Sequence, residues 1–135
     1  MLRSAFCVLR NEDRILLYLR DNKPYIPDPG HWALLGGRLK EDETPSQGIE
    51  RELREEIDCQ VYNLAYVDKI LEEAENYPNK ETLFLFKGDV NTEIKDIKLF
   101  EGQRLGYFTF EEFKDLKVSK IIKDYIIKNK HRLFG

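Results

Sequence analysis

The 135-residue sequence predicts a single mixed α/β domain, residues 1–135, with a central β-sheet between helices. Three observations support this fold class. Short β-rich segments stand on both sides of one strongly amphipathic segment, and a second amphipathic segment closes the chain. No repeat, low-complexity segment or linker divides the sequence. A chain of this length can bury one core, so a single domain is expected.

The strands follow from local patterns along the chain. The segments "SAFCVLR" and "RILLYLR" are separated by the turn signal "NED" and predict a hairpin. Three prolines and a glycine in "DNKPYIPDPGH" then predict a surface loop. The segment "WALLGGRL" is expected to be a strand that contains the Gly36–Gly37 pair. Further strands are predicted at 60–75, 82–90 and 106–110, with an exposed turn at 76–80.

The clearest helix is "EDETPSQGIERELREEID", and a closing amphipathic helix is predicted at "SKIIKDYIIKNKH". Thr44 is a good N-cap, Pro45 suits the first helical position, and Gln47 completes a capping box. An apolar residue recurs at every fourth position and predicts one buried stripe. These residues are Ile49, Leu53 and Ile57.

Composition excludes several classes of protein. The net charge is −3, so no basic field suggests a nucleic acid partner. The longest apolar runs are about five residues, far short of a membrane span, and the N-terminus has no apolar core of a secretory signal. Cys7 and Cys59 lie in apolar, strand-like settings and are interpreted as reduced thiols. A cytoplasmic location is therefore expected.

Three acids lie in an unfavourable place. Glu52, Glu55 and Glu56 fall near the end of the first helix, where the negative end of the helix dipole disfavours carboxylates. They share an arc of about 100° beside the apolar stripe. A bound divalent cation would reverse the local charge balance, and Mg²⁺ prefers carboxylate oxygens. The alternative is a solvated face with ion pairs at i,i+4 spacing. Those pairs are Glu50–Arg54 and Arg51–Glu55.

The spacing of these acids resembles a known motif. The segment "GRLKEDETPSQGIERELREEIDC" resembles the Nudix box, G-x5-E-x7-R-E-U-x-E-E-x-G-U, where U is apolar. Two positions depart from it: Leu35 replaces a frequent proline, and Asp58 replaces the second glycine. Asp tolerates the left-handed conformation of a helix C-cap, so the fold is expected to stay intact. The resemblance to the Nudix hydrolases, in particular the MutT-like enzymes, implies a mixed sheet sandwiched between helices.

The resemblance also implies roles for residues. Glu52, Glu55, Glu56 and the carbonyl of Gly36 are expected to bind Mg²⁺, with Mn²⁺ as a substitute, and Arg51 with Glu43 to orient neighbouring carboxylates. Arg51 could instead be a surface partner of Glu55, and the double glycine could be only a bulge or tight bend. These roles agree with the chemistry, because a cation neutralises a pyrophosphate and helps generate hydroxide.

A second segment resembles the 8-oxo-dGTP diphosphatases. The "EGQ" at 101–103 matches the segment in which a loop glutamate contributes to the metal site, so Glu101 is a further expected ligand. The general base is assigned to Glu52 or Glu101 without a choice between them. Arg20 ends a strand and either meets a phosphate or caps an exposed edge. Several aromatic residues are candidates for stacking on a base, although each is more often a core residue. They are Tyr25, Trp32, Tyr77, Tyr107 and Phe108.

The sequence therefore predicts a Mg²⁺-dependent pyrophosphohydrolase that cleaves the P–O–P link of a nucleoside diphosphate joined to another group. A nucleoside triphosphate, oxidised or not, is the preferred substrate and would give a monophosphate and pyrophosphate. Alternatives are an ADP-sugar or a dinucleoside polyphosphate as substrate, a nucleotide-binding module without catalysis, and a purely structural cation site. Homodimers are common in the family, so a homodimer is an alternative to a monomer.

Overall fold

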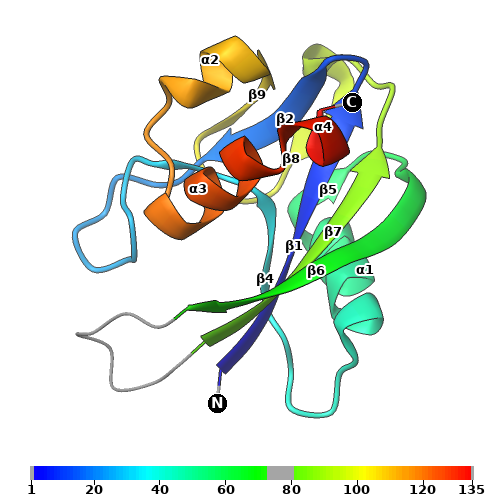
Figure 1. Ribbon diagram of the computed structural model, residues 1–135, viewed down its shortest axis with the longest axis vertical. Helices are drawn as coiled ribbons and strands as arrows, with labels where there is room; N and C mark the ends of the chain where they lie inside the picture. Colours follow the sequence, from blue (N-terminus) through cyan, green and yellow to red (C-terminus); the bar gives the residue numbers. More distant parts are fainter. Residues whose placement is uncertain (1, 73–80, 135) are drawn as a thin grey trace.

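The computed structural model describes residues 2–72 and 81–134 (Figure 1). The predicted turn at 76–80 lies outside these residues. No helix in the described ranges is long and apolar enough to cross a membrane. The elements in chain order are β1 (Leu2–Asn11), β2 (Arg14–Leu19), β3 (Trp32–Ala33), β4 (Leu35–Arg38), α1 (Pro45–Glu56), β5 (Ile57–Asp58), β6 (Tyr62–Glu72), β7 (Glu81–Asp89), the short 3-10 helix η1 (Ile94–Asp96), β8 (Lys98–Leu99), β9 (Arg104–Thr109), α2 (Phe110–Lys114), α3 (Lys120–Lys128) and α4 (Lys130–Leu133).

A seven-stranded mixed sheet forms the centre of the described structure. Its main path is β3-β2-β1-β7-β6, with β4 also paired to β1 and β9 also paired to β2. The β1–β7 pair is parallel and the other pairs are antiparallel. The predicted hairpin is confirmed, with Leu9 opposite Leu16. A separate two-stranded sheet joins β5 to β8.

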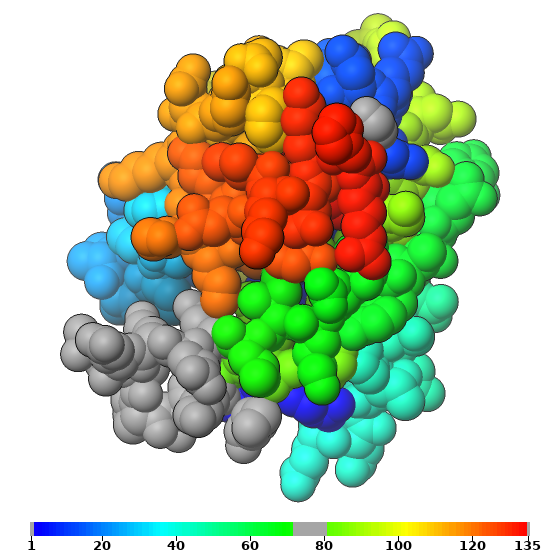
Figure 2. All heavy atoms as spheres, in the orientation of Figure 1, coloured from blue at the N-terminus to red at the C-terminus, as the bar shows by residue number. Residues whose placement is uncertain are grey.

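The strand pattern divides the core into two parts, one on each face of the sheet. On β2, Leu16 and Tyr18 belong to the cluster that α1 covers, whereas Ile15 and Leu17 belong to the cluster beneath α2, α3 and α4. The period of two that characterises a strand buried on both faces produces this division. Figure 2 shows the C-terminal helices covering one face of the sheet beside β6. The predicted mixed α/β fold with a sheet between helices is confirmed.

The first predicted helix is confirmed in detail. Thr44 is the N-cap of α1, with a reciprocal capping box to Gln47 and Pro45 in the first turn. Ile49, Leu53 and Ile57 are all buried against the sheet. These features place the C-terminal turn of α1 against the sheet.

The end of α1 differs from the prediction. Ile57 is the C-cap and is extended, with φ −137° and ψ 152°, and Asp58 continues into β5 opposite Lys98. Asp58 is not among the described residues with positive φ, so the left-handed C-cap was wrong. No glycine is needed at this position because the chain leaves the helix directly into a strand.

Two further predictions are corrected. The expected strand at 32–39 is two strands, because β3 pairs with β2 and β4 pairs with β1. The closing helix is broken between α3 and α4 at Asn129, which has φ −112° and ψ 32°. The Asn129 Nδ2 donates a 2.8 Å hydrogen bond to the Tyr125 carbonyl. A side chain that bonds locally to the backbone in this way favours the end of a helix.

Candidate active site

The three helical acids differ sharply in exposure. The Glu56 residue is 1% exposed, the Glu52 side chain is 13% exposed and the Glu55 side chain is 57% exposed. All three lie in the last turns of α1, as predicted. The expected common face therefore runs from the core at Glu56 to solvent at Glu55, so the three carboxylates are not equivalent.

Glu56 is a buried carboxylate of which only one oxygen accepts a hydrogen bond in the described structure. The Gly36 N–H donates to Glu56 Oε1 at 2.9 Å. Oε2 is buried and accepts no hydrogen bond from any residue that the structure describes. Burial, followed by the charges of Glu101 and Glu52, raises the pKa of Glu56 to about 9. A cation beside Oε2 would remove this cost.

The double glycine provides space for this arrangement. A Cβ on Gly37 would lie 2.7 Å from Glu52 Oε2, so any larger residue would displace that carboxylate. Gly36 has φ +143°, and a Cβ there would lie 2.1 Å from the Ala5 carbonyl oxygen. Residues 35–38 nevertheless pair with β1 in unbroken register, so the alternative of a bulge or tight bend is not seen. The structure shows instead a close approach of Gly36 to the β1 backbone and of Gly37 to the Glu52 carboxylate.

Arg51 and Glu43 form the predicted pair. The Arg51 guanidinium donates to both carboxylate oxygens of Glu43, and Lys40 N–H donates to Glu43 Oε1 at 2.8 Å. The Arg51 hydrogen bonds are the main cause that lowers the pKa of Glu43 to about 2. Arg51 Nη1 also donates to Glu52 Oε1 at 2.9 Å and to Glu55 Oε2 at 3.0 Å. Arg51 thus contacts three carboxylates, one of them its i,i+4 neighbour Glu55.

The predicted loop residue Glu101 lies beside the end of α1. The Phe100 N–H donates to the Glu56 carbonyl at 2.8 Å, which brings the "EGQ" segment to the last helical turn. Glu101 is exposed, and no described residue donates a hydrogen bond to its carboxylate. Its charge nevertheless contributes to the raised pKa of Glu56. The sequence and the structure thus bring Glu52, Glu56 and Glu101 to one region.

Arg20 reaches the same region together with Tyr18, which sequence reasoning missed. Arg20 Nη1 is 3.5 Å from the Tyr18 hydroxyl, and Arg20 Nε is buried without a partner among the described residues. Burial and the charge of Glu56 raise the pKa of Tyr18 to about 12, while Arg20 lowers it. The strand period of two would have indicated Tyr18, because Tyr18 lies two residues before Arg20, which directly follows β2.

The aromatic candidates are dispersed. Trp32 and Phe108 make an edge-to-face contact at 4.8 Å in the cluster on the α3 face, and the Arg104 guanidinium lies 5.5 Å from the Trp32 ring. Tyr107 is anchored by a 2.7 Å hydrogen bond to the Thr92 carbonyl. Tyr25 is 78% exposed. Tyr77 lies outside the described residues. The structure therefore does not group the four described rings around the carboxylates.

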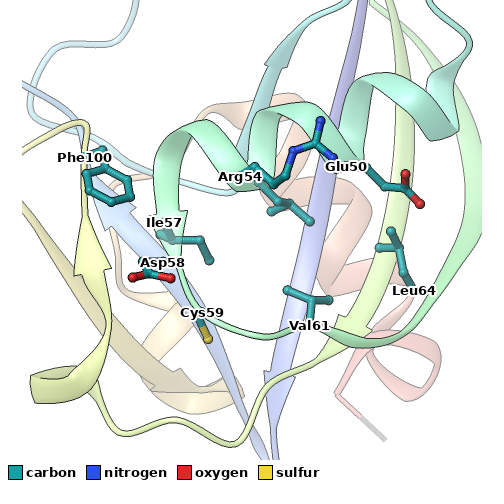
Figure 3. Close-up of a pocket in the computed structure, with 9 residues that line it drawn as sticks. Glu50, Arg54, Ile57, Asp58, Cys59, Val61, Leu64 and Phe100 are labelled. Carbon is teal, nitrogen blue, oxygen red and sulfur yellow. The ribbon is translucent and has the colours of Figure 1, made fainter.

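A groove of about 640 Å³ lies on another side of α1 (Figure 3). At 100° per residue, Arg54 is about 160° around the helix from Glu52. The groove is thus separate from the buried carboxylates. Its lining residues are Glu50, Leu53, Arg54, Ile57, Asp58, Cys59, Val61, Leu64 and Phe100.

The donor set fits a hard divalent cation that keeps part of its water shell. Within residues 2–72 and 81–134, no three His, Cys, Asp or Glu side chains already form a group that could hold an ion. Mg²⁺ does not need such a cage, because it binds one or two carboxylates, waters and substrate phosphates. The unpaired Glu56 Oε2 and the adjacent Glu52 carboxylate are suitable oxygen donors.

Comparisons with known proteins agree on one family. The model of the NUDIX domain matches residues 1–129. An 8-oxo-dGTP diphosphatase of Proteus vulgaris is 35% identical over 57 residues, which are 42% of this chain and 48% of that relative, so the match spans about half of its length.

Two solved structures show the same fold. The NUDIX domain of Shewanella oneidensis NrtR, complexed with ADP ribose, has a TM-score of 0.78 and 16% identity, covering 98% of this chain and 88% of that one. The MutT protein of Methanosarcina mazei Go1 has a TM-score of 0.71 and 20% identity, covering 97% and 94%. With the matched residues 1–129, these comparisons show that the chain belongs to the NUDIX domain family.

Proposed function

We propose that this chain is a Mg²⁺-dependent pyrophosphohydrolase that cleaves the P–O–P link of a nucleoside diphosphate joined to another group. The observation that carries the proposal is the buried, unpaired Glu56 Oε2 in the company of Glu52 and Glu101. Ionised carboxylates this close to one another and to the negative end of a helix repel, and a bound cation would offset that repulsion. Family membership adds support, because the chain carries the Nudix box on the helix that holds two of these acids.

The proposed cation ligands are Glu52, Glu55, Glu56, Glu101 and the carbonyl of Gly36. In this arrangement, Glu55 would contact the ion from the solvent side and Glu56 from the buried side. When bound, Mg²⁺ supplies charge neutralisation for the pyrophosphate and lowers the pKa of a coordinated water.

The other polar residues have supporting roles. Arg51 holds Glu52 and Glu55 through one nitrogen, while Glu43 holds Arg51. The proton acceptor for the attacking water is Glu52 or Glu101. Glu52 shares one oxygen with Arg51, and Glu101 has no hydrogen-bond partner in the described ranges, so each retains an oxygen that can accept a proton.

The proposed substrate is a nucleoside triphosphate, oxidised or not, which gives a monophosphate and pyrophosphate. The "EGQ" segment and the partial match to an 8-oxo-dGTP diphosphatase support this choice. Arg20 is the proposed phosphate contact, because its buried Nε lacks a partner in the described structure. Trp32, Phe108 and Tyr77 are kept as weaker proposals for contact with the base.

A nucleotide-binding module without catalysis is the alternative from another class. A similar fold binds ADP ribose in the NrtR NUDIX domain, so ADP ribose and other ADP-sugars belong in any substrate test. Dinucleoside polyphosphates are the remaining enzymatic alternative. A homodimer and a cytoplasmic location stay predictions, and light scattering after size exclusion measures the first of these.

The test is phosphate release across a panel of substrates. Nucleoside triphosphates, oxidised nucleotides, dinucleoside polyphosphates and nucleotide sugars are each incubated with Mg²⁺, Mn²⁺ or chelator, and the products are coupled to pyrophosphatase and phosphatase. Metal-dependent release by the native chain is expected, with loss of at least 100-fold in Glu56→Gln, the order expected when a charge-stabilising group is removed.

Glu50→Gln is the matched control. Glu50 is exposed on the groove side of the same helix and makes no hydrogen bond in the described ranges, so this variant should keep full activity. Nucleotide binding without release across the whole panel would replace the hydrolase with the binding module. Metal-dependent stabilisation without nucleotide binding or release would instead favour a structural cation site.

A further inference from the structure

The loop Phe100–Gln103 connects two elements that hold the proposed site. At its first end, the Phe100 N–H donates to the Glu56 carbonyl at 2.8 Å, immediately after the Ile57–Leu99 pairing of β5 and β8. Glu101 follows this contact directly. The first end is therefore fixed to the C-terminal turn of α1.

The other end of the loop is fixed to the end of β2. The Gln103 backbone N–H donates to the Leu19 carbonyl at 2.9 Å, and the Gln103 side-chain Nε2 donates to the Arg20 carbonyl at 2.7 Å. Gly102 has φ +81°, and a Cβ there would lie 2.7 Å from the Tyr18 ring. Gln103 thus fixes the end of the loop by hydrogen bonds, and Gly102 lets the loop pack closely on Tyr18. Both lie next to Arg20, the proposed phosphate contact.

Glu101 itself has no comparable anchor. It is exposed, and its carboxylate accepts no hydrogen bond from a described residue. Its position beside the helix end must therefore come from the backbone on either side. Among the hydrogen bonds that anchor the loop in the described ranges, only one is made by a side chain, that of Gln103.

We propose that Gln103 is a positioning residue whose side-chain amide fixes the loop to β2 and thereby places the Glu101 carboxylate beside the end of α1. The inference rests on the proposed function, since it takes Glu101 to be a cation ligand. Gln is suited to this position because its amide N–H donates to the Arg20 carbonyl. A Glu side chain of the same shape has no donor when ionised and would repel that carbonyl.

The first test is made on the metal-free protein and needs no turnover. Hydrogen exchange of the amides of residues 100–104 is measured in Gln103→Ala and in the native chain. Loss of one net hydrogen bond corresponds to about fivefold faster exchange. Gln60→Ala is the matched control, because Gln60 is exposed and its side chain makes no hydrogen bond in the described structure. In Gln60→Ala, the amides of residues 100–104 should exchange at the same rate as in the native chain.

The second test asks whether Gln103 acts through Glu101. Mn²⁺ affinity is measured by electron paramagnetic resonance for the native chain, Glu101→Gln, Gln103→Ala and the double variant. We expect Gln103→Ala to weaken Mn²⁺ binding about fivefold and the double variant to bind like Glu101→Gln alone. Gln103→Glu should show the same loss, whereas the Gln60→Ala control should not.

The outcomes separate this inference from the proposed function. Unchanged loop exchange in Gln103→Ala overturns the inference, as does faster exchange with unchanged Mn²⁺ binding. Losses that multiply in the double variant also overturn it, because Gln103 would then act independently of Glu101. If the expected exchange and binding pattern is found but no nucleotide is hydrolysed, the positioning role stands and only the hydrolase proposal fails.

Discussion

Replacing Glu56 by glutamine is expected to stabilise the metal-free protein at neutral and alkaline pH while it abolishes turnover. Glu56 is buried, its Oε2 has no partner in the described structure, and its pKa is raised to about 9. A glutamine keeps the oxygen that accepts the Gly36 N–H bond and carries no charge. The change therefore removes the cost of keeping a buried carboxyl protonated above its ordinary pKa, and it removes a proposed cation ligand at the same time.

The pH dependence has a definite sign. The unfolded carboxyl ionises near 4.5, whereas the folded one stays protonated up to about 9. The stability contributed by the protonated form is fully present below pH 4.5 and is lost as pH rises through about 9. The maximum slope is about 1.4 kcal/mol per pH unit. For a domain of this size the slope corresponds to roughly 3 to 5 °C in Tm per pH unit.

The assay is thermal unfolding between pH 5.5 and 8.5 in chelator and then in Mg²⁺. The difference in Tm between Glu56→Gln and the native chain should grow as pH rises, because only the native chain titrates at this position. Mg²⁺ should raise the Tm of the native chain and leave the variant nearly unchanged. Glu50→Gln, on the exposed side of α1, should follow the native curve. Parallel curves for Glu56→Gln and the native chain in chelator would refute the reasoning.

Three other substitutions test separate contacts. Gly37→Ala places a Cβ 2.7 Å from Glu52 Oε2. It should lower kcat about tenfold or more and raise the Mg²⁺ concentration needed for half-maximal activity, and an unchanged Mg²⁺ titration would contradict this. Arg51→Lys loses the forked contact to Glu43 and the Nη1 contacts to Glu52 and Glu55, and it should cost about 1 to 3 kcal/mol in urea unfolding together with a fall in kcat. Tyr125→Phe removes the 2.7 Å hydrogen bond to Asp68 and should cost about 1 kcal/mol with unchanged kcat/KM, so a loss of activity would place this contact in the site.

The sequence predicted the structure best where short-range features, such as helix caps and apolar periodicity, determine it. The Thr44 N-cap, the Pro45 start and the buried stripe on α1 were all predicted because capping and helical periodicity depend on neighbours within one turn or two. The hairpin of β1 and β2 was predicted for the same reason. The wrong expectation at Asp58 came from a motif position that assumes a left-handed residue, while the pairing of β5 with β8 depends on residues 40 positions later.

The candidate site shows the same division. The spacing of the helical acids and the Arg51–Glu43 pair could be predicted from the Nudix box, and a place for Glu101 near them from the "EGQ" segment. The order of burial of the three acids follows their angular distance from the apolar stripe on the helix. The nearly complete burial of Glu56 could not be predicted, because it depends on how α1 packs on β4 and on the Phe100 contact to the Glu56 carbonyl. The contact of Gln103 with the Arg20 carbonyl joins residues 83 positions apart, and no local pattern indicates it.

The hydrogen bonds at the end of α1 explain why the helix can carry acidic residues in its last turns. The Phe100 N–H satisfies the Glu56 carbonyl, and the Ile57 N–H satisfies the Leu53 carbonyl, so part of the negative end of the dipole is already compensated. What stays uncompensated is the charge of the carboxylates, which Arg51 neutralises only on the exposed side. On the buried side, Glu56 Oε2 accepts no hydrogen bond from any residue that the structure describes. The fold thus leaves one oxygen-lined position whose occupation by Mg²⁺ would stabilise the protein and complete the proposed site in a single step.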